Sequence, residues 1–192
     1  PSTPQRMLKG GLVMATFTGR MLRAAKLDVN LYEEVEADTG GTPQAMGVVV
    51  LGSLAAGVGA GQGGLVAMLM VAAAALIGWF VFAYLTYWIG TRLLPEPQTS
   101  ATHGELLRTI GFANSPSILR VLGVIPIPGL RDIVFLVTGV WMLVATIIAV
   151  RQALDYRGTL RAVGVCALGW LIQVILIVIV LYLLGGRAGP AP

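Results

Sequence analysis

One hydrophobic segment contains the polar residues with the clearest potential for chemistry. The segment 110–129 reads IGFANSPSILRVLGVIPIPG and includes Asn114, Ser115, Ser117 and Arg120. An arginine that faced lipid at the centre of a membrane would cost about 3 kcal/mol on the insertion scale, and intramembrane polar residues often mark a functional site. We therefore expect Arg120 to face protein, water or a membrane interface.

Three prolines, Pro116, Pro126 and Pro128, prevent this segment from forming one regular helix. A break at Pro116 would give two half-helices, 110–115 and 117–125, an arrangement that transporters use to expose backbone at a binding site. A short, tilted and partly interfacial span, shielded by the other spans, is the second interpretation.

Acidic residues are the next candidates for chemistry. Paired carboxylates can bind a metal or act as acid and base, but no histidine or glycine-rich ion loop accompanies these. The pattern favours a solvated acidic helix that docks on the basic helix before it. The acids are Asp28, Glu33, Glu34, Glu36 and Asp38.

The chain has one cysteine, Cys166, and one histidine, His103. Neither a disulfide nor a zinc site can be assembled from them, and a catalytic triad lacks partners. An enzyme that acts on lipid with Glu33, Glu36 or His103 as its base would need a nucleophile, metal cluster or phosphate-binding loop, which the sequence does not offer. We expect no enzymatic activity, no cofactor and no metal.

The composition indicates an integral membrane protein. Of 192 residues, 56% are hydrophobic and 11% are charged, whereas average soluble domains carry about 25% charged residues. The net charge of +4 suggests contact with anionic lipid headgroups. Basic residues do not cluster with aromatic residues, so no nucleic-acid partner is expected.

The uncharged runs predict an all-α polytopic fold with five transmembrane helices. No charged residue occurs between Thr39 and Thr91, which as a helix would extend roughly 80 Å and must cross a bilayer core of about 30 Å twice. Glycines at 59–64 predict the turn. The five predicted spans are 45–61, 65–90, 110–125, 133–150 and 162–184.

Single residues within these spans carry further predictions. Gln173 is the one polar residue in the last span, and it can form a hydrogen bond to a neighbouring helix. Trp79 and the aromatic residues after it, up to Trp88, favour an interfacial aromatic belt or a place in the core over an aromatic cage for a ligand.

The sequence divides into a cytoplasmic N-terminal segment (1–43), a membrane domain (44–185) and a flexible tail (186–192). Residues 1–27 predict a basic amphipathic helix that lies either in the headgroup plane or on the protein's own body. Its apolar face comprises Val13, Met14, Phe17, Met21 and Ala24, and its basic face Lys9, Arg20, Arg23 and Lys26.

Basic residues predict the orientation. Five lie in the N-terminal segment, two in the 92–108 loop and three in the 151–161 loop, whereas the opposite side has Arg131 and Arg187. Because lysine and arginine favour the cytoplasmic side, we expect the N-terminus inside and the C-terminus outside.

Three stretches resemble the YIP family, the Ypt/Rab-interacting membrane proteins, in its prokaryotic branch: LYEEVEAD (31–38), GFANSP (111–116) and VWMLVATIIAVRQALD (140–155). GFANSP is similar to the family's motif G-[YF]-x-x-x-P, and the residues that match the motif's fixed positions are Gly111, Phe112 and Pro116. The eukaryotic D-L-Y-G-P has no Gly-Pro counterpart at 30–34. The resemblance therefore implies a five-span fold in a prokaryotic plasma (inner) membrane, without a GTPase partner.

Two functions remain open. Small residues such as Gly52 and Ala56 favour a membrane scaffold or accessory subunit that acts through helix–helix contacts, with membrane lipids and a membrane-protein partner or a second copy of the chain as partners. The alternative is a small transporter or lipid-handling protein with its site at the broken third span. The odd span number argues against an inverted-repeat transporter. The candidate residues are Gly111, Phe112, Asn114, Ser115, Pro116 and Arg120.

Overall fold

The computed structural model describes residues 16–61 and 63–185, which form helices and no strand. Four helices in this part of the chain are long and apolar enough to cross a membrane, which confirms the prediction of an all-helical, multi-pass membrane protein. Most of the predicted basic helix and the predicted tail lie outside the described residues.

The four long helices agree with four of the predicted spans to within a few residues. The predicted glycine turn is also present, and Gly61 and Gly64 adopt positive φ angles of 73° and 92° there. The helices are α4 (Thr42–Gly59), α5 (Leu65–Trp88) with its π-helical extension η2 (Ile89–Leu93), α7 (Leu130–Ala153) and α8 (Thr159–Gly185).

The third predicted span consists of two different helices. α6 (His103–Ala113) begins with a capping box, in which Thr102 and Glu105 each bind the other's backbone N–H. After Asn114 the chain continues as a 3₁₀ helix, η3 (Ser115–Val124), with Pro116 in its first turn. This matches the interpretation of a break at Pro116. The segment is not one of the four long apolar helices, so a fifth crossing stays a prediction.

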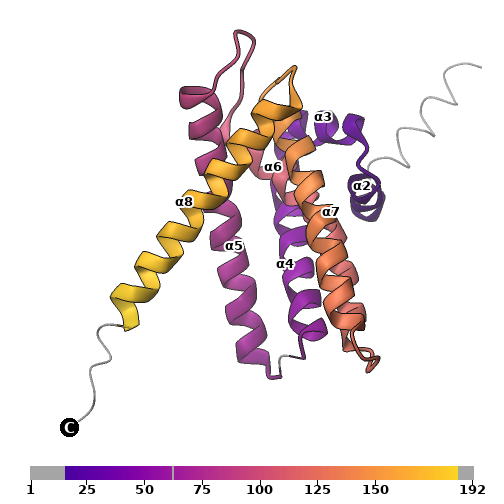
Figure 1. The fold of residues 1–192 in the computed structure, drawn as a ribbon. Helices are drawn as coiled ribbons and strands as arrows, with labels where there is room; N and C mark the ends of the chain where they lie inside the picture. Colours follow the sequence, from indigo (N-terminus) through magenta and orange to yellow (C-terminus); the bar gives the residue numbers. More distant parts are fainter. Residues whose placement is uncertain (1–15, 62, 186–192) are drawn as a thin grey trace, which may run out of the picture.

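α4 packs against α5, and η3 packs against both α4 and α7. Figure 1 shows α8 leaning away from the other helices toward its C-terminal end. The loops before α6 and α8 lie together with the N-terminal helices at one end. Gln152 donates to Glu33 over 3.0 Å, and Arg161 donates to the carbonyl of Pro95 over 2.6 Å. The three basic segments predicted to share a side of the membrane therefore share one end of the molecule.

The N-terminal helices α2 (Phe17–Ala25) and α3 (Val29–Ala37) pack on the protein's own body, with the 3₁₀ turn η1 (Thr39–Gly41) leading into α4. Arg20, predicted on the basic face of the N-terminal helix, is only 7% exposed, because that face meets the acidic helix α3. Arg20 donates to Glu34 (3.0 Å), Asp38 (2.7 Å) and Gln44 (3.0 Å), so three acceptors compensate for its burial.

Two side chains of the membrane helices hold these N-terminal helices in place. Buried Arg108 of α6 donates to the carbonyls of Val35 and Glu36, which lie in the last turn of α3 and lack partners within that helix. Trp141 of α7 donates to the carbonyl of Ala25 over 2.8 Å. The predicted acidic helix is therefore docked on α2, α6 and α7.

Four carboxylates converge where α3 meets α6 and the end of α7. Glu33, Glu36, Glu105 and Asp155 line a pocket of about 250 Å³. Burial, followed by repulsion from Glu105, Asp155 and Glu33, raises the pKa of Glu36 from 4.5 to about 7. Glu36 therefore takes up its proton far more readily in the folded chain than in the unfolded chain.

We expect Glu36→Gln to raise the melting temperature at pH 8 by a few degrees and to leave it nearly unchanged at pH 4.5. Because the pKa of Glu36 is higher in the folded chain, the folded state is stabilised fully below pH 4.5, and this stabilisation is lost as the pH rises toward 7. A neutral glutamine at this position does not ionise and avoids that loss. Thermal unfolding of the full chain in detergent at both pH values checks this. An equal shift at both would contradict it.

Candidate functional site

Close packing of small residues joins α4 to η3. A Cβ atom on Gly52 would lie 1.9 Å from the Ser117 hydroxyl oxygen, and one on Gly59 would lie 1.8 Å from the carbonyl oxygen of Arg120. A 3₁₀ helix has three residues per turn, so Ser117, Arg120 and Gly123 lie above one another on the side that meets α4. Glycines in α4 therefore allow η3 to approach its backbone directly.

The small residues of α4 were predicted to serve helix–helix contacts in a larger assembly, and the structure corrects this for Gly52. Gly52 is buried inside the chain against Ser117. Gly47 likewise faces the Phe17 ring of α2. These glycines serve close contacts within the chain. Small residues in a sequence predict a close helix–helix contact, but they do not say whether the facing helix belongs to the same chain or to a partner.

Four of the predicted site residues are packing residues. A Cβ on Gly111 would lie 2.6 Å from the Ala45 side chain, and the Phe112 ring is fully buried. Ser115 and Pro116 are buried at the start of η3, where the Ser115 hydroxyl donates to the carbonyl of Phe112 over 2.7 Å. Together they fix the junction between α6 and η3. They do not reach a cavity.

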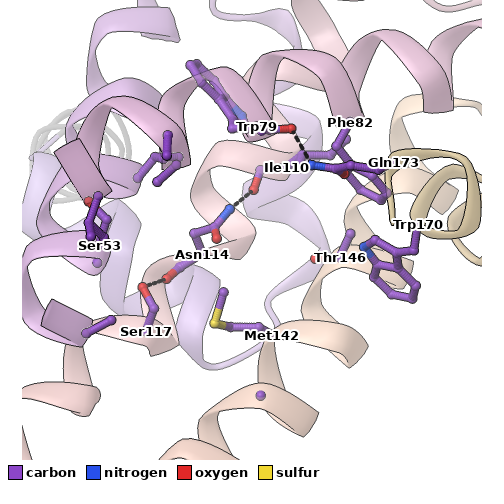
Figure 2. Close-up of a pocket in the computed structure, with 18 of the residues that line it drawn as sticks. Ser53, Trp79, Phe82, Ile110, Asn114, Ser117, Met142, Thr146, Trp170 and Gln173 are labelled. Atoms are coloured by element: carbon purple, nitrogen blue, oxygen red, sulfur yellow. Dashed lines mark hydrogen bonds between the residues drawn. The ribbon is translucent and has the colours of Figure 1, made fainter. Parts of the chain in front are cut away.

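The other two predicted residues, Asn114 and Arg120, line a cavity of about 600 Å³. Its wall comes from α4, α5, α7 and α8 as well as from the third segment (Figure 2). The lining residues of α5, α7 and α8 lie near the middle of these apolar helices. The cavity therefore lies at the level of the apolar, membrane-spanning part of the fold and is open on one side.

Several polar groups of the cavity hold each other in place (Figure 2). Asn114 donates through Nδ2 to the carbonyl of Ile110 (2.9 Å), and Ser117 donates to the carbonyl of Asn114 (2.6 Å). Gln173 of α8 donates through Nε2 to the carbonyl of Gly78 in α5 (3.1 Å), as the interhelical prediction requires. Because these bonds use amide nitrogens, the side-chain amide oxygens of Asn114 and Gln173 can still accept from a ligand.

Arg120 faces the protein, one of the three environments expected for it. Its Nε donates to the Thr138 hydroxyl over 3.0 Å, and its guanidinium carbon lies 5.1 Å from the centre of the Phe135 ring. None of the six ion pairs among residues 16–61 and 63–185 includes Arg120. A cation at the edge of an apolar cavity can bind and orient an anionic group.

Aromatic residues of the wall were not predicted as site residues. Trp79 was expected either in an interfacial belt or in the core; it lies in the core, where it is buried and donates through Nε1 to the carbonyl of Leu107 over 3.1 Å. The Trp170 and Phe82 rings stack with their centroids 5.6 Å apart. No local sequence signal distinguishes such residues from a belt, because their partners come from distant helices.

A family model for the Yip1 domain matches residues 40–183, most of the chain. No curated protein matches the sequence, and no solved structure matches the fold. The matched range begins just before α4 and ends near the end of α8, so it includes every helix that forms the cavity. The chain belongs to the Yip1 domain family of membrane proteins.

Proposed function

We propose that this chain is a non-enzymatic membrane protein that takes an amphipathic molecule from the bilayer into the cavity beside the broken third segment. The observation that carries the proposal is the cavity itself, which combines apolar walls with a few polar groups in the middle of the spans. Its volume of about 600 Å³ is within the range of about 300–1,000 Å³ that is common for small-molecule sites.

Exposed residues at the rim support entry from the lipid side. Ala74 of α5, Leu143 of α7 and Ile177 of α8 contribute to the cavity lining and are also exposed. All three lie well inside apolar helices, where the surroundings would be hydrocarbon. A molecule dissolved in the bilayer would therefore reach the cavity without passing through water.

The proposal includes five crossings of a prokaryotic plasma membrane. At about 1.5 Å per residue for α6 and about 2.0 Å for η3, the third segment covers roughly 36 Å, enough for a bilayer core of about 30 Å. It runs from the end of the molecule where α5 finishes to the end where α7 begins (Figure 1). The concentration of arginine at the end that carries α3 favours that end as cytoplasmic, with the C-terminus outside.

A scaffold or accessory subunit is the second candidate, and α8 favours it. Residues 174–183 of α8 are exposed and apolar, and this part of the helix leans away from α5 and α7 (Figure 1). A helix of a partner protein, or of a second copy, would fit beside it. A particle on a native gel that contains a second protein in fixed ratio would favour this candidate.

The test of the first candidate is a pair of substitutions in α5. Ala75 lines the cavity, whereas Ala73 lies on the exposed face of the same helix. We expect wild-type protein extracted in gentle detergent to retain a bilayer-derived amphiphile, measured by mass spectrometry of the extract. Ala75→Phe should reduce its amount several-fold because the ring fills the cavity, and Ala73→Phe should not. Equal retention by both variants would overturn the proposal.

A further inference from the structure

We propose that the molecule held in the cavity is an anionic amphiphile, with its acidic headgroup at Arg120 and one apolar chain along the cavity. This inference rests on the function proposed above and adds the chemical class of the ligand. The headgroup is a carboxylate or a phosphate, the two anions whose oxygens can accept two parallel hydrogen bonds from one guanidinium.

The charge distribution leaves Arg120 without a counter-ion of its own. The sequence has nine Asp and Glu residues, and all of them lie in the described part of the chain. Eight are in α3, its flanks, the first turn of α6 or the loops at the same end, and the ninth, Asp132, lies 3.9 Å from Arg131. A half-buried cation in an apolar surrounding is poorly solvated, so a ligand with a negative charge would lower its electrostatic free energy.

The geometry of Arg120 holds its charge ready for such a ligand. The bond to Thr138 uses Nε, and the Phe135 ring covers one face of the guanidinium. Neither terminal nitrogen forms a hydrogen bond within residues 16–61 and 63–185, although Arg120 contributes to the cavity lining. Two N–H donors that point in one direction are therefore available for a carboxylate or phosphate.

The position of Arg120 also fits the direction of a lipid. Thr138 lies about 12 Å along α7 from Leu130, the end of that helix opposite α3, whereas the cavity continues to Thr146, about 12 Å deeper. The deeper part is lined by Phe82 and Trp170. A ligand with its head at Arg120 would thus have the same orientation as a lipid in that leaflet, with its chain toward the membrane centre.

The experiment measures binding of three amphiphiles with the same chain to the full-length protein in neutral detergent by native mass spectrometry. The probes are palmitate, hexadecyl phosphate and hexadecylphosphocholine, and inorganic phosphate serves as a fourth. We expect the two anionic amphiphiles to bind about tenfold more tightly than the zwitterionic one. Arg120→Gln should remove that preference, and Arg120→Lys, which keeps the charge but loses the paired donors, should retain only part of it.

Each outcome separates this inference from the function on which it rests. If all three amphiphiles bind equally and Ala75→Phe blocks them, the cavity function stands and the anionic preference is wrong. If none binds to wild-type protein, both fail. If inorganic phosphate binds as tightly as hexadecyl phosphate, the site takes a free anion, and the headgroup assignment is wrong. The comparison in wild-type protein needs no variant, so a folding defect in an Arg120 variant does not affect it.

Discussion

Replacing Gly59 by alanine should lower the free energy of unfolding by about 3 kcal/mol, near the upper end of the usual range for overpacking. The added methyl group would lie 1.8 Å from the carbonyl oxygen and 2.8 Å from the carbonyl carbon of Arg120. Both atoms belong to the backbone of η3, so no change of rotamer relieves the contact. η3 must move away from α4, which also shifts Arg120 and the cavity beside it.

Two other glycines provide the controls for this prediction. A Cβ on Gly63 meets nothing within 4 Å, so Gly63→Ala should leave the stability nearly unchanged. Gly52→Ala should have an intermediate effect, because its nearest neighbour is the Ser117 hydroxyl, which can rotate. Unfolding of the full chain in mixed micelles measures all three variants. A Gly59→Ala variant as stable as Gly63→Ala would show that η3 and α4 are less closely packed than described.

Arg20→Leu is expected to lower the free energy of unfolding by about 1–3 kcal/mol, because it leaves Glu34 and Asp38 without their shared partner. These carboxylates remain about one-third exposed, which keeps the loss below that of a fully buried pair. The bond from Arg20 also holds the pKa of Asp38 below its ordinary value of 3.8. The bond between Arg20 and Asp38 therefore contributes to the folding stability above pH 3.8, and this contribution is lost as the pH falls below that value.

Lys26→Leu is the matched control for this substitution, since Lys26 is exposed at the C-cap of the same helix, α2. Thermal unfolding at pH 7 and at pH 3 should show a clear difference between Arg20→Leu and wild type at pH 7, and a smaller difference at pH 3. Hydrogen exchange in α3 should accelerate in Arg20→Leu alone. Unchanged exchange would mean that Arg108 and the ion pairs of Arg23 with Asp28 and Glu34 suffice to hold α3 in place.

The apolar runs of the sequence were sufficient to predict four of the long helices, because a membrane crossing needs only length and the absence of charge. The break at Pro116 was also predictable, since proline lacks the N–H that a helix needs. The 3₁₀ form of η3 was not predictable, because it depends on contact with Gly52 and Gly59.

The candidate site was predictable only in part. A charged or amide side chain within an apolar run signals a special environment, and this identified Asn114 and Arg120. The partners of Trp79, Gly52 and Arg20 could not be predicted for a common reason: each is buried by residues of another segment of the chain. Local periodicity says which side of a helix a residue occupies, and it carries no information about which other helix meets that side.

The contacts that dock α2 and α3 also impose an order on biosynthesis. Ala25 is bonded to Trp141, 116 positions later, and Glu33 is bonded to Gln152, 119 positions later. A ribosome that adds about 5–20 residues per second needs on the order of ten seconds to cover that separation. During this time two long apolar helices and the whole third segment are already made. The first helices of the chain are thus among the last to reach their final place, and until then their ion pairs must hold them together without the rest of the protein.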